Sequence, residues 1–548
     1  MSRVLGRREF VQRSLAAGAV LIAPKLAGAE APDVFPGPGL AGGRGLPLDD
    51  ALFEKSIAEL HAEMERGALT SQAITRRYLA RISEMDKQGP AINAVIELNP
   101  DALAIAEQRD VERRAGGVRG PLHGIPVLIK DNIDSADKMR TSAGSLALAT
   151  STPPKDAFIV ERLRQAGAVL VGKTNLSEWA NFRSTRSTSG WSGRGGLTRN
   201  PYVLDRNPCG SSSGTGAAIA ADFATVGIGT ETDGSIICPS SICGLVGIKP
   251  TVGLWSRSGI IPISRSQDTA GPMARSVADA AALLGALTGV DPRDAATHAS
   301  EGKGAPDYTH FLDAGGLKGA RIGVARNLAG FNTDVDAAFE RAIAALKDGG
   351  AEVVDKTNLL TAGKFDDAET IVLDYEFKAG LNSYLALLGP SAPVKTLAEL
   401  IAWNDREKER EMPWFGQEIF VRSEKRGPLT DKKYLDARAK CLRLARTQGI
   451  DAVMTNNKLD AIICPSNQPA WTTDLLNGDH FTGGNTSFAA VAGYPSVTVP
   501  MGFVHELPVG LSFIGRAWSE GLLIKYAYAF EQLTKVRRAP RYLTTATG

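Results

Sequence analysis

Two glycine-flanked serine clusters lie close together between residues 209 and 241 of the chain. Residues 210–214 read Gly-Ser-Ser-Ser-Gly, and residues 233–235 read Asp-Gly-Ser. Glycine beside a serine lets the backbone approach a ligand closely and adopt dihedral angles that other residues avoid. The alanine and glycine residues after the first cluster predict a closely packed helix, and a short apolar strand follows it. We therefore expect both clusters at one end of the same sheet.

A third polar group, Lys130, ends an apolar run upstream of these clusters. Residues 127–129 are Val-Leu-Ile, which is typical of a buried strand. Long charged side chains are rarely buried without a partner, so a lysine here is most often exposed or in a salt bridge. A lysine in an apolar pocket behaves differently, because loss of hydration lowers its pKa and leaves it neutral near pH 7. In that second case Lys130, Ser211 and Ser235 form a candidate proton relay.

The segments around these residues resemble the signature blocks of one hydrolase family. They are GIPVLIKDNID at residues 124–134, CGSSSGTGAA at 209–218 and GTETDGSI at 229–236. In these blocks the chain is similar to the amidase signature family, the Ser-cisSer-Lys hydrolases, and most similar to its bacterial peptide amidase branch. The resemblance covers residues 50–300 and 455–535. It implies an α/β fold in which residues 49–548 form a single large domain, with a mixed central β-sheet covered by helices on both faces.

The resemblance also assigns roles to individual residues. Ser235 is the nucleophile, Ser211 passes its proton on, and Lys130 is the general base that receives it. A cis peptide bond is implied at Ser211. The oxyanion of the tetrahedral intermediate is expected to accept hydrogen bonds from the backbone N–H groups of Thr232, Asp233, Gly234 and Ser235. No metal ion or cofactor is expected in this mechanism.

The function that the resemblance implies is hydrolysis of carboxylic amides through an acyl-enzyme. We expect the C-terminal amide of small peptides as the substrate, with release of ammonia, and aryl acylamides or other amides as the alternative. Many family members carry arginine two residues after the nucleophile, whereas this chain has Ile237, which leaves the substrate preference open. Two other classes of protein stay as alternatives: an amidotransferase component that acts on charged tRNA, and a periplasmic binding protein without catalysis.

Three other motif matches have simpler explanations. Residues 167–174 fit the phosphate-binding pattern GxxxxGK[ST], but the four middle residues, Ala-Val-Leu-Val, are those of a strand. Ser212 is central in a GxSxG match, yet the residues before it are turn-rich, and no histidine has a spacing that identifies it as a base. A match to SxxK at residues 135–138 lacks an accompanying KTG. We therefore predict neither nucleotide binding nor a different nucleophile.

The first 48 residues differ in composition from the rest of the chain. Residues 1–29 resemble a twin-arginine export signal, with Arg7 and Arg8, then an apolar run and a small-residue cleavage pattern. Residues 30–48 are rich in proline and glycine and predict a linker or an extended arm. We expect a periplasmic or secreted protein without a membrane span in the mature chain. The net charge of only +2 gives no reason to expect a nucleic-acid partner.

Five cysteines leave at least one thiol unpaired. Cys238 and Cys243 have a spacing that would allow a disulfide. Proteins exported by the twin-arginine route fold in the reducing cytosol, so we expect buried free thiols instead. No cysteine or histidine cluster has the spacing of a zinc site.

Periodicity predicts several elements outside the signature blocks. They are helices from about Asp50 and from Ser71, and strands over residues 92–98, 459–464 and 495–501. Residues 366–447 are expected to be mostly helical, and in the family such a region helps to cover the substrate cleft. The loop before residue 495 contains Trp471 and Phe488, which either line the cleft or pack in the core.

Overall fold

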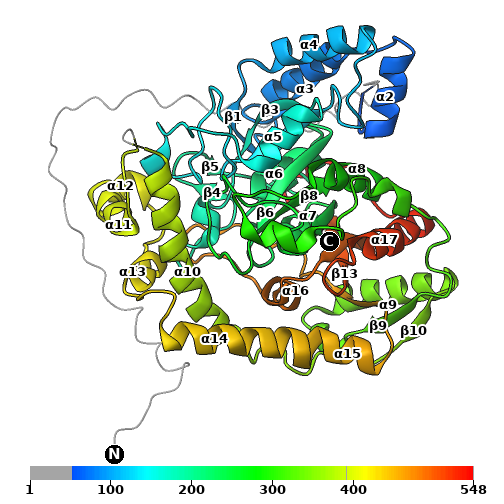
Figure 1. Ribbon diagram of the computed structural model, residues 1–548. Coiled ribbons are helices and arrows are strands. Elements are labelled where there is room, and N and C mark those ends of the chain that lie inside the picture. Colours follow the sequence, from blue (N-terminus) through cyan, green and yellow to red (C-terminus); the bar gives the residue numbers. More distant parts are fainter. Residues whose placement is uncertain (1–51, 390–391, 547–548) are drawn as a thin grey trace, which may run out of the picture. The chain divides into compact units, whose positions relative to one another are not determined.

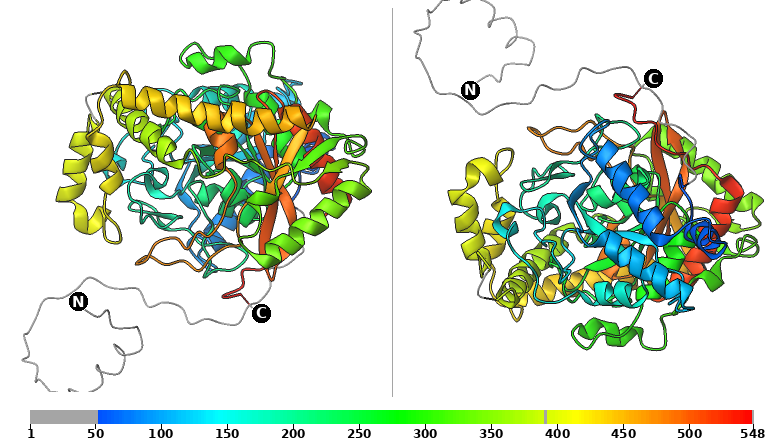
Figure 2. Two further views of the ribbon diagram at one scale, coloured as in Figure 1. Left: turned by 90° about the horizontal axis from the view of Figure 1, so that it is seen from below. Right: turned by 90° about the horizontal axis from the view of Figure 1, so that it is seen from above.

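An eleven-stranded sheet forms the centre of the fold (Figure 1 and Figure 2). The computed structural model describes residues 52–389 and 392–546, and the expected export signal and arm lie outside these residues. The strand order is β1-β3-β2-β6-β8-β7-β12-β13-β11-β9-β10. The sheet is mixed, because β2 is parallel to β3 and β6, whereas β8 is antiparallel to both β6 and β7. The strands are β1 Val95–Leu98, β2 Pro126–Lys130, β3 Val169–Thr174, β6 Val226–Glu231, β7 Val246–Lys249, β8 Thr269–Ala274, β9 Arg321–Val324, β10 Glu352–Val354, β11 Ala461–Pro465, β12 Ser496–Val504 and β13 Leu507–Ile514.

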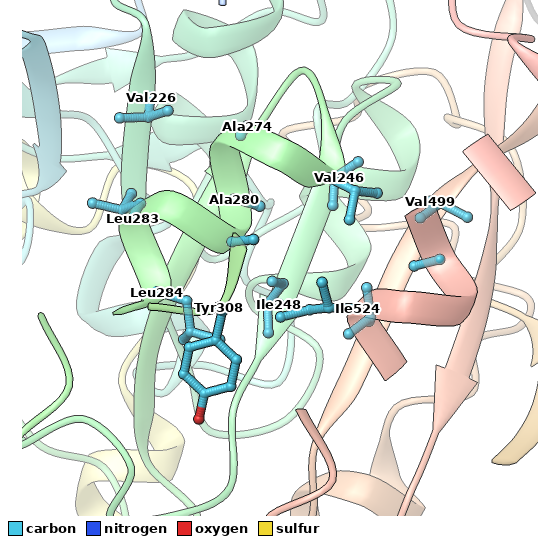
Figure 3. Packing of buried hydrophobic residues seen from close by; sticks show 14 of the residues in the cluster. Val226, Val246, Ile248, Ala274, Ala280, Leu283, Leu284, Tyr308, Val499 and Ile524 are labelled. Carbon is cyan, nitrogen blue, oxygen red and sulfur yellow. The ribbon is translucent and has the colours of Figure 1, made fainter. Parts of the chain in front are cut away.

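Helices α5, α8, α9 and α17 cover one face of the sheet. Their bounds are Phe158–Gln165, Val277–Leu287, Thr333–Asp348 and Glu520–Thr534. Each helix contributes apolar side chains to the largest buried cluster. Figure 3 shows Leu283 of α8 in this cluster together with Val226 of β6 and Ile248 of β7. Removal of these side chains from water, worth about 25 cal/mol per Å² of apolar surface, holds the helices on the sheet.

The opposite face carries four helices that lie close to the serine clusters. They are α3 Ser71–Met85, α4 Ala102–Arg114, α6 Ser213–Ala220 and α7 Ile237–Ile242. The small-residue helix α6 is buried at every position. A side chain at Gly214 would overlap the backbone carbonyl groups of Ala94 and Asn175, so α6 begins directly against neighbouring backbone. The small residues therefore bring the first serine cluster to the edge of the sheet.

Residues 366–456 form a largely helical layer, in agreement with the periodicity of the sequence. Its helices are α10 Asp366–Leu387, α11 Leu397–Arg406, α12 Lys408–Glu411, α13 Glu418–Glu424, α14 Lys432–Leu442 and α15 Asp451–Asn456. Figure 1 shows α11, α12 and α13 gathered beside α10. Asp374 of α10 pairs with Arg422 of α13 at 2.8 Å, and Phe377 of α10 stacks on Phe420 of α13. These contacts hold α13 on α10.

Among the described residues, no helix is both long and apolar enough to cross a membrane.

The first described helix, α2 (Ile57–Glu65), begins later than the sequence analysis predicted. Asp50 lies outside the described residues, and residues 52–56 are not helical. Ser56 is the reason, because its Oγ accepts the N–H of Glu59 while the Glu59 carboxylate accepts the N–H of Ser56. This reciprocal pair satisfies backbone donors that a helix start leaves free, and it fixes the start at Ile57.

Strand β1 begins at Val95, whereas the sequence analysis placed its start at Ile92. Ala91 and Asn93 have φ angles of +51° and +56°, which lie in the left-handed region and not in the extended region. The apolar pattern alone does not reveal these backbone angles.

Candidate active site

The ends of two neighbouring strands position the candidate residues. Lys130 is the last residue of β2, and Ser235 follows β6 by four residues. Because β2 and β6 are adjacent and parallel, their carboxyl ends lie at the same edge of the sheet. Ser211 precedes α6, which packs on both strands. The three residues therefore meet at one edge of the sheet.

Lys130 is fully buried and bonded only to neutral groups. Its Nζ donates to Ser211 Oγ at 2.8 Å, to Thr230 Oγ1 at 2.9 Å and to Thr230 O at 3.3 Å. Within residues 52–389 and 392–546 it has no ion-pair partner within 4.0 Å. Burial lowers the pKa of Lys130 to about 7, although the fields of Glu231 and Asp268 oppose the shift. A substantial share of the side chain is therefore neutral at pH 7 and able to accept a proton.

Ser211 is held by its backbone as well as by Lys130. The peptide bond between Gly210 and Ser211 is cis. The carbonyl oxygen of Ser211 accepts the N–H of Ser177 at 3.0 Å. Its Oγ, which Lys130 contacts, also lies on the wall of a cavity. Ser211 therefore stands between the buried amine and the open space of the site.

Ser235 lies beside the first serine cluster and retains a little exposure. Its carbonyl oxygen accepts the N–H of Ser212 at 3.2 Å, and 8% of the residue is exposed. Its Oγ makes no hydrogen bond to another residue in the described part of the chain, so Ser211 and Ser235 are neighbours without a direct hydroxyl contact. Hydrogen bonds between catalytic groups are often long without substrate and tighten when it binds.

The loop between β6 and α7 presents free backbone donors. Within the described ranges, the N–H groups of Thr232, Asp233, Gly234 and Ser235 donate to no other residue. Gly234 has a φ of +83°, which glycine adopts without strain. The carboxylate of Asp233 accepts the hydroxyls of Thr486 at 2.5 Å and Ser487 at 2.6 Å, so its side chain is already used and leaves the amides free. This loop can therefore offer N–H groups to an oxyanion.

Two cavities border the same loop. The first, of about 200 Å³, is lined by Ser211, Thr232 and a group of apolar side chains that includes Ile261 and Ile263. The second, of about 280 Å³, is lined by Gly234 and Trp471, among others. An open groove of about 910 Å³ shares Trp471 and Asp479 with the second cavity. Trp471 therefore lines the cleft.

Phe488, the other aromatic residue of that loop, packs in the core. Its ring meets the ring of Phe365 edge-on, at 5.2 Å between centroids. Phe488 is also a member of a buried apolar cluster. The two alternatives stated for the loop therefore both occur, one at each aromatic residue.

Two rival motif matches lose their support in the structure. Ser212 Oγ exchanges hydrogen bonds with the backbone of Thr230 and is fully buried, so it holds α6 against β6 and is no exposed nucleophile. Lys173 of the GxxxxGK[ST] match lies within β3 and donates to Thr141 Oγ1 at 2.9 Å. The phosphate-binding pattern is therefore part of a buried strand.

The chain matches the family model for Amidase over residues 73–524. It belongs to the amidase family. This amidase is a hydrolase acting on amides. Its fold is that of the native peptide amidase from Stenotrophomonas maltophilia, with 53% identity, a TM-score of 0.86, and coverage of 89% of this chain and 99% of that chain.

Curated relatives of this amidase fall into two groups. A probable amidase from Arabidopsis thaliana is 42% identical over 503 residues, covering 90% of this chain and 92% of that protein. One of the subunits of glutamyl-tRNA(Gln) amidotransferase, from Caldanaerobacter subterraneus, is 34% identical and covers 89% of this chain and 98% of that protein. The amidotransferase is therefore similar at a lower identity.

A disulfide between Cys209 and Cys238 corrects the expectation of free thiols in this amidase. The pair considered from spacing, Cys238 with Cys243, does not form, because α7 separates the two residues by five positions and turns them to different sides. Cys209 and Cys238 have Cα atoms 6.1 Å apart, which suits a disulfide. The bond links the residue before the first serine cluster to α7, which follows the second. Cys243, Cys441 and Cys464 are free and buried.

Three residues that the sequence analysis did not single out also shape the amidase site. Thr230 Oγ1 accepts from Lys130 and from Asn132 Nδ2, the latter at 3.0 Å. Asp268 accepts the hydroxyl of Thr232 at 2.6 Å, and burial raises the pKa of Asp268 to about 6. Thr230 and Asn132 stand within two residues of quoted motif positions, which is the signal that could have identified them. Asp268 comes from a distant segment without such a signal.

Proposed function

We propose that this amidase hydrolyses carboxylic amides through a relay of Ser235, Ser211 and Lys130. The contact between Lys130 Nζ and Ser211 Oγ at 2.8 Å, inside a fully buried environment, is the observation that carries the proposal. An unactivated serine hydroxyl is a poor nucleophile and requires a base within reach. A neutral amine beneath Ser211 supplies that base through one intervening hydroxyl.

In the proposed first half-reaction, Ser235 Oγ attacks the amide carbonyl carbon. Its proton moves to Ser211 Oγ, and the proton of Ser211 moves to Lys130. The negative oxygen accepts hydrogen bonds from the free N–H groups of residues 232–235. When the carbon–nitrogen bond breaks, the same relay run backwards protonates the leaving nitrogen, and an ester on Ser235 remains.

In the second half-reaction, water attacks the ester carbonyl on Ser235. The proton of water passes through Ser211 to Lys130 while the carbon–oxygen bond forms. Collapse of the second tetrahedral intermediate returns that proton to Ser235 Oγ. The products are a carboxylic acid and ammonia or an amine, and the three side chains regain their starting protonation states.

We propose C-terminal amides of short peptides as the substrates. The similarity at 53% identity to a peptide amidase supports this choice, and a structure of peptide amidase in complex with the competitive inhibitor chymostatin is equally similar. The open groove that continues from the second cavity offers room for a chain longer than one residue. Aryl acylamides are the alternative substrates. The amidotransferase reading has the weaker support, because the similarity to those proteins is lower.

We also propose that the protein is exported to the periplasm or secreted. The arginine pair and apolar run of residues 1–29 support this location. The disulfide between Cys209 and Cys238 adds support, because such bonds persist in oxidising compartments and are rare in the cytosol.

Active-site labelling tests the proposed function directly. A sulfonyl fluoride should acylate Ser235 in the wild-type protein, and peptide mapping by mass spectrometry should place the label there. Ser235→Ala should neither take the label nor release ammonia from amidated dipeptides. A panel of amidated dipeptides and an anilide, assayed for ammonia and amine, separates the two substrate classes. Full activity in Ser235→Ala would refute the relay.

A further inference from the structure

Glu231 makes a contact that none of the proposed relay residues makes. It is the last residue of β6, and only 1% of it is exposed. Its Oε2 accepts the backbone N–H of Ile236 at 2.7 Å and that of Ile237 at 2.9 Å. Those two amides directly follow Ser235. The side chain therefore spans the whole loop from the end of β6 to the start of α7.

This contact sorts the backbone donors of the loop into two groups. The carboxylate of Glu231 takes the N–H groups of residues 236 and 237, while those of residues 232–235 stay free. The loop is thus closed by a side chain from its own first residue. Without that closure, the backbone of Ser235 would be anchored mainly through its carbonyl bond to Ser212 N–H and the first turn of α7. The position of the Ser235 hydroxyl then depends on Glu231.

Charged groups from several elements face Glu231 and Lys130. Lys249 of β7 acts on Glu231 and opposes the effect of burial, which raises the pKa of Glu231, whereas Asp233 adds to that effect. Burial lowers the pKa of Lys249 to about 8, against the fields of Glu231, Glu520 and Asp233. Two carboxyl groups act on Lys130, those of Glu231 and Asp268. Glu231 is therefore the acid that touches both the loop and the charge balance of the base.

We propose that Glu231 is a positioning residue of the proposed amidase reaction. Its carboxylate holds the loop that bears Ser235, and its negative charge favours the ammonium form of Lys130. This inference rests on the proposed relay and extends it to a fourth side chain. Glu231 acts through Ser235 and Lys130, and not by touching the reacting atoms.

Two substitutions separate the two parts of the proposal. Glu231→Gln keeps an oxygen within reach of both amides and removes the charge. The acid limb of the kcat/KM profile should then move to lower pH, because the ammonium form of Lys130 loses a favourable field. Glu231→Asp keeps the charge but shortens the side chain. Its kcat should fall about tenfold to hundredfold, because the nucleophile is misplaced, while the acid limb stays where it is.

Glu520→Gln is the matched control. Glu520 is equally buried, also faces Lys249, and accepts the N–H of Thr251 at 2.7 Å at the start of α17. Its loss removes a buried carboxylate beside the same lysine without loosening the loop of Ser235. This variant should keep the wild-type acid limb. Circular dichroism and thermal unfolding report the folding of all three variants.

Several outcomes would overturn the proposal. An acid limb that stays in place in Glu231→Gln, or that moves equally in Glu520→Gln, contradicts the electrostatic part. A wild-type kcat in Glu231→Asp contradicts the positioning part. Each variant tests its own part, so the loss of one to misfolding leaves the other decisive. A wild-type enzyme without an acid limb near pH 7, or an active Ser235→Ala, would instead contradict the relay itself.

Discussion

The amine of Lys130 and the hydroxyl of Ser211 lie 2.8 Å apart, and neither residue has any exposed surface. A charged ammonium in that place would lose its hydration without gaining an acidic partner. The neutral form is favoured for this reason, and the contact with Ser211 gives that form a proton to take. The chemistry of the site therefore depends on how dry this contact stays.

The pH dependence of the reaction should follow Lys130. Its pKa of about 7 in the folded protein means that the amine is charged below pH 7 and neutral above it. We expect kcat/KM to rise with pH through about 7 and to level off above it. Initial rates of ammonia release between pH 5 and 9 measure this directly. A flat profile across that range would argue against Lys130 as the base.

Lys130→Arg should abolish most of the activity although it preserves the positive charge. A guanidinium stays protonated in proteins, so it donates hydrogen bonds but cannot accept the proton of Ser211. Loss of a general base costs about 10²- to 10⁴-fold in rate. Single-turnover acylation by the sulfonyl fluoride checks the step concerned. An arginine variant that acylates as fast as the wild type would require a different base.

Reduction of the Cys209–Cys238 bond should destabilise the protein. The two cysteines are 29 residues apart, and a cross-link closing a loop of that length is worth about 3 to 4 kcal/mol. Urea unfolding with and without dithiothreitol should show that difference in the wild type. The double variant Cys209→Ser, Cys238→Ser should show none. Cys464→Ser, which removes a buried free thiol, should respond to dithiothreitol as the wild type does.

Glu411 should make stability fall as pH rises. Burial, together with the nearby charge of Glu178, raises the pKa of Glu411 from 4.5 to about 8. Below pH 4.5 the group is protonated in both states and its contribution is complete, and this contribution is lost as pH rises through 8. Between pH 6 and 8 the free energy of unfolding should drop by about 2 kcal/mol on this account.

Glu411→Gln tests this linkage, because it stays neutral while an oxygen still accepts the Ser145 hydroxyl, as the carboxylate does in the wild type. Urea unfolding at pH 6 and pH 8 should give a smaller difference for this variant than for the wild type. Glu409→Gln changes an exposed residue of the same helix and serves as the control. Equal pH dependence in all three proteins would show that Glu411 does not hold its proton.

Local patterns identified the elements around the site because each pattern lies within one short stretch. The apolar run ending at Lys130 became β2, and the alanine-rich stretch after Ser211 became α6. Strand β8 was not predicted, since Thr-Ala-Gly-Pro-Met-Ala contains glycine and proline, which are rare in central strands. It is a strand because β6 and β7 bind it from both sides.

Contacts between distant segments account for most of what the sequence did not reveal. The pairing of Cys209 with Cys238 depends on a distance of 6.1 Å between their Cα atoms, which no spacing rule encodes. Asp268 reaches Thr232 from the segment before β8. By contrast, the hydrogen bonds of Glu231 stay within six residues, but they depend on the loop's conformation.

The proposed relay residues and the cavity walls come from separate parts of the chain. The relay residues all lie between β2 and α7, whereas the walls are built largely by residues 257–265 and 466–487. Relatives can thus diverge in the wall segments while inheriting an unchanged reaction centre. For protein engineering, exchange of those two segments between homologues is a modular route to new substrates that leaves bond cleavage intact.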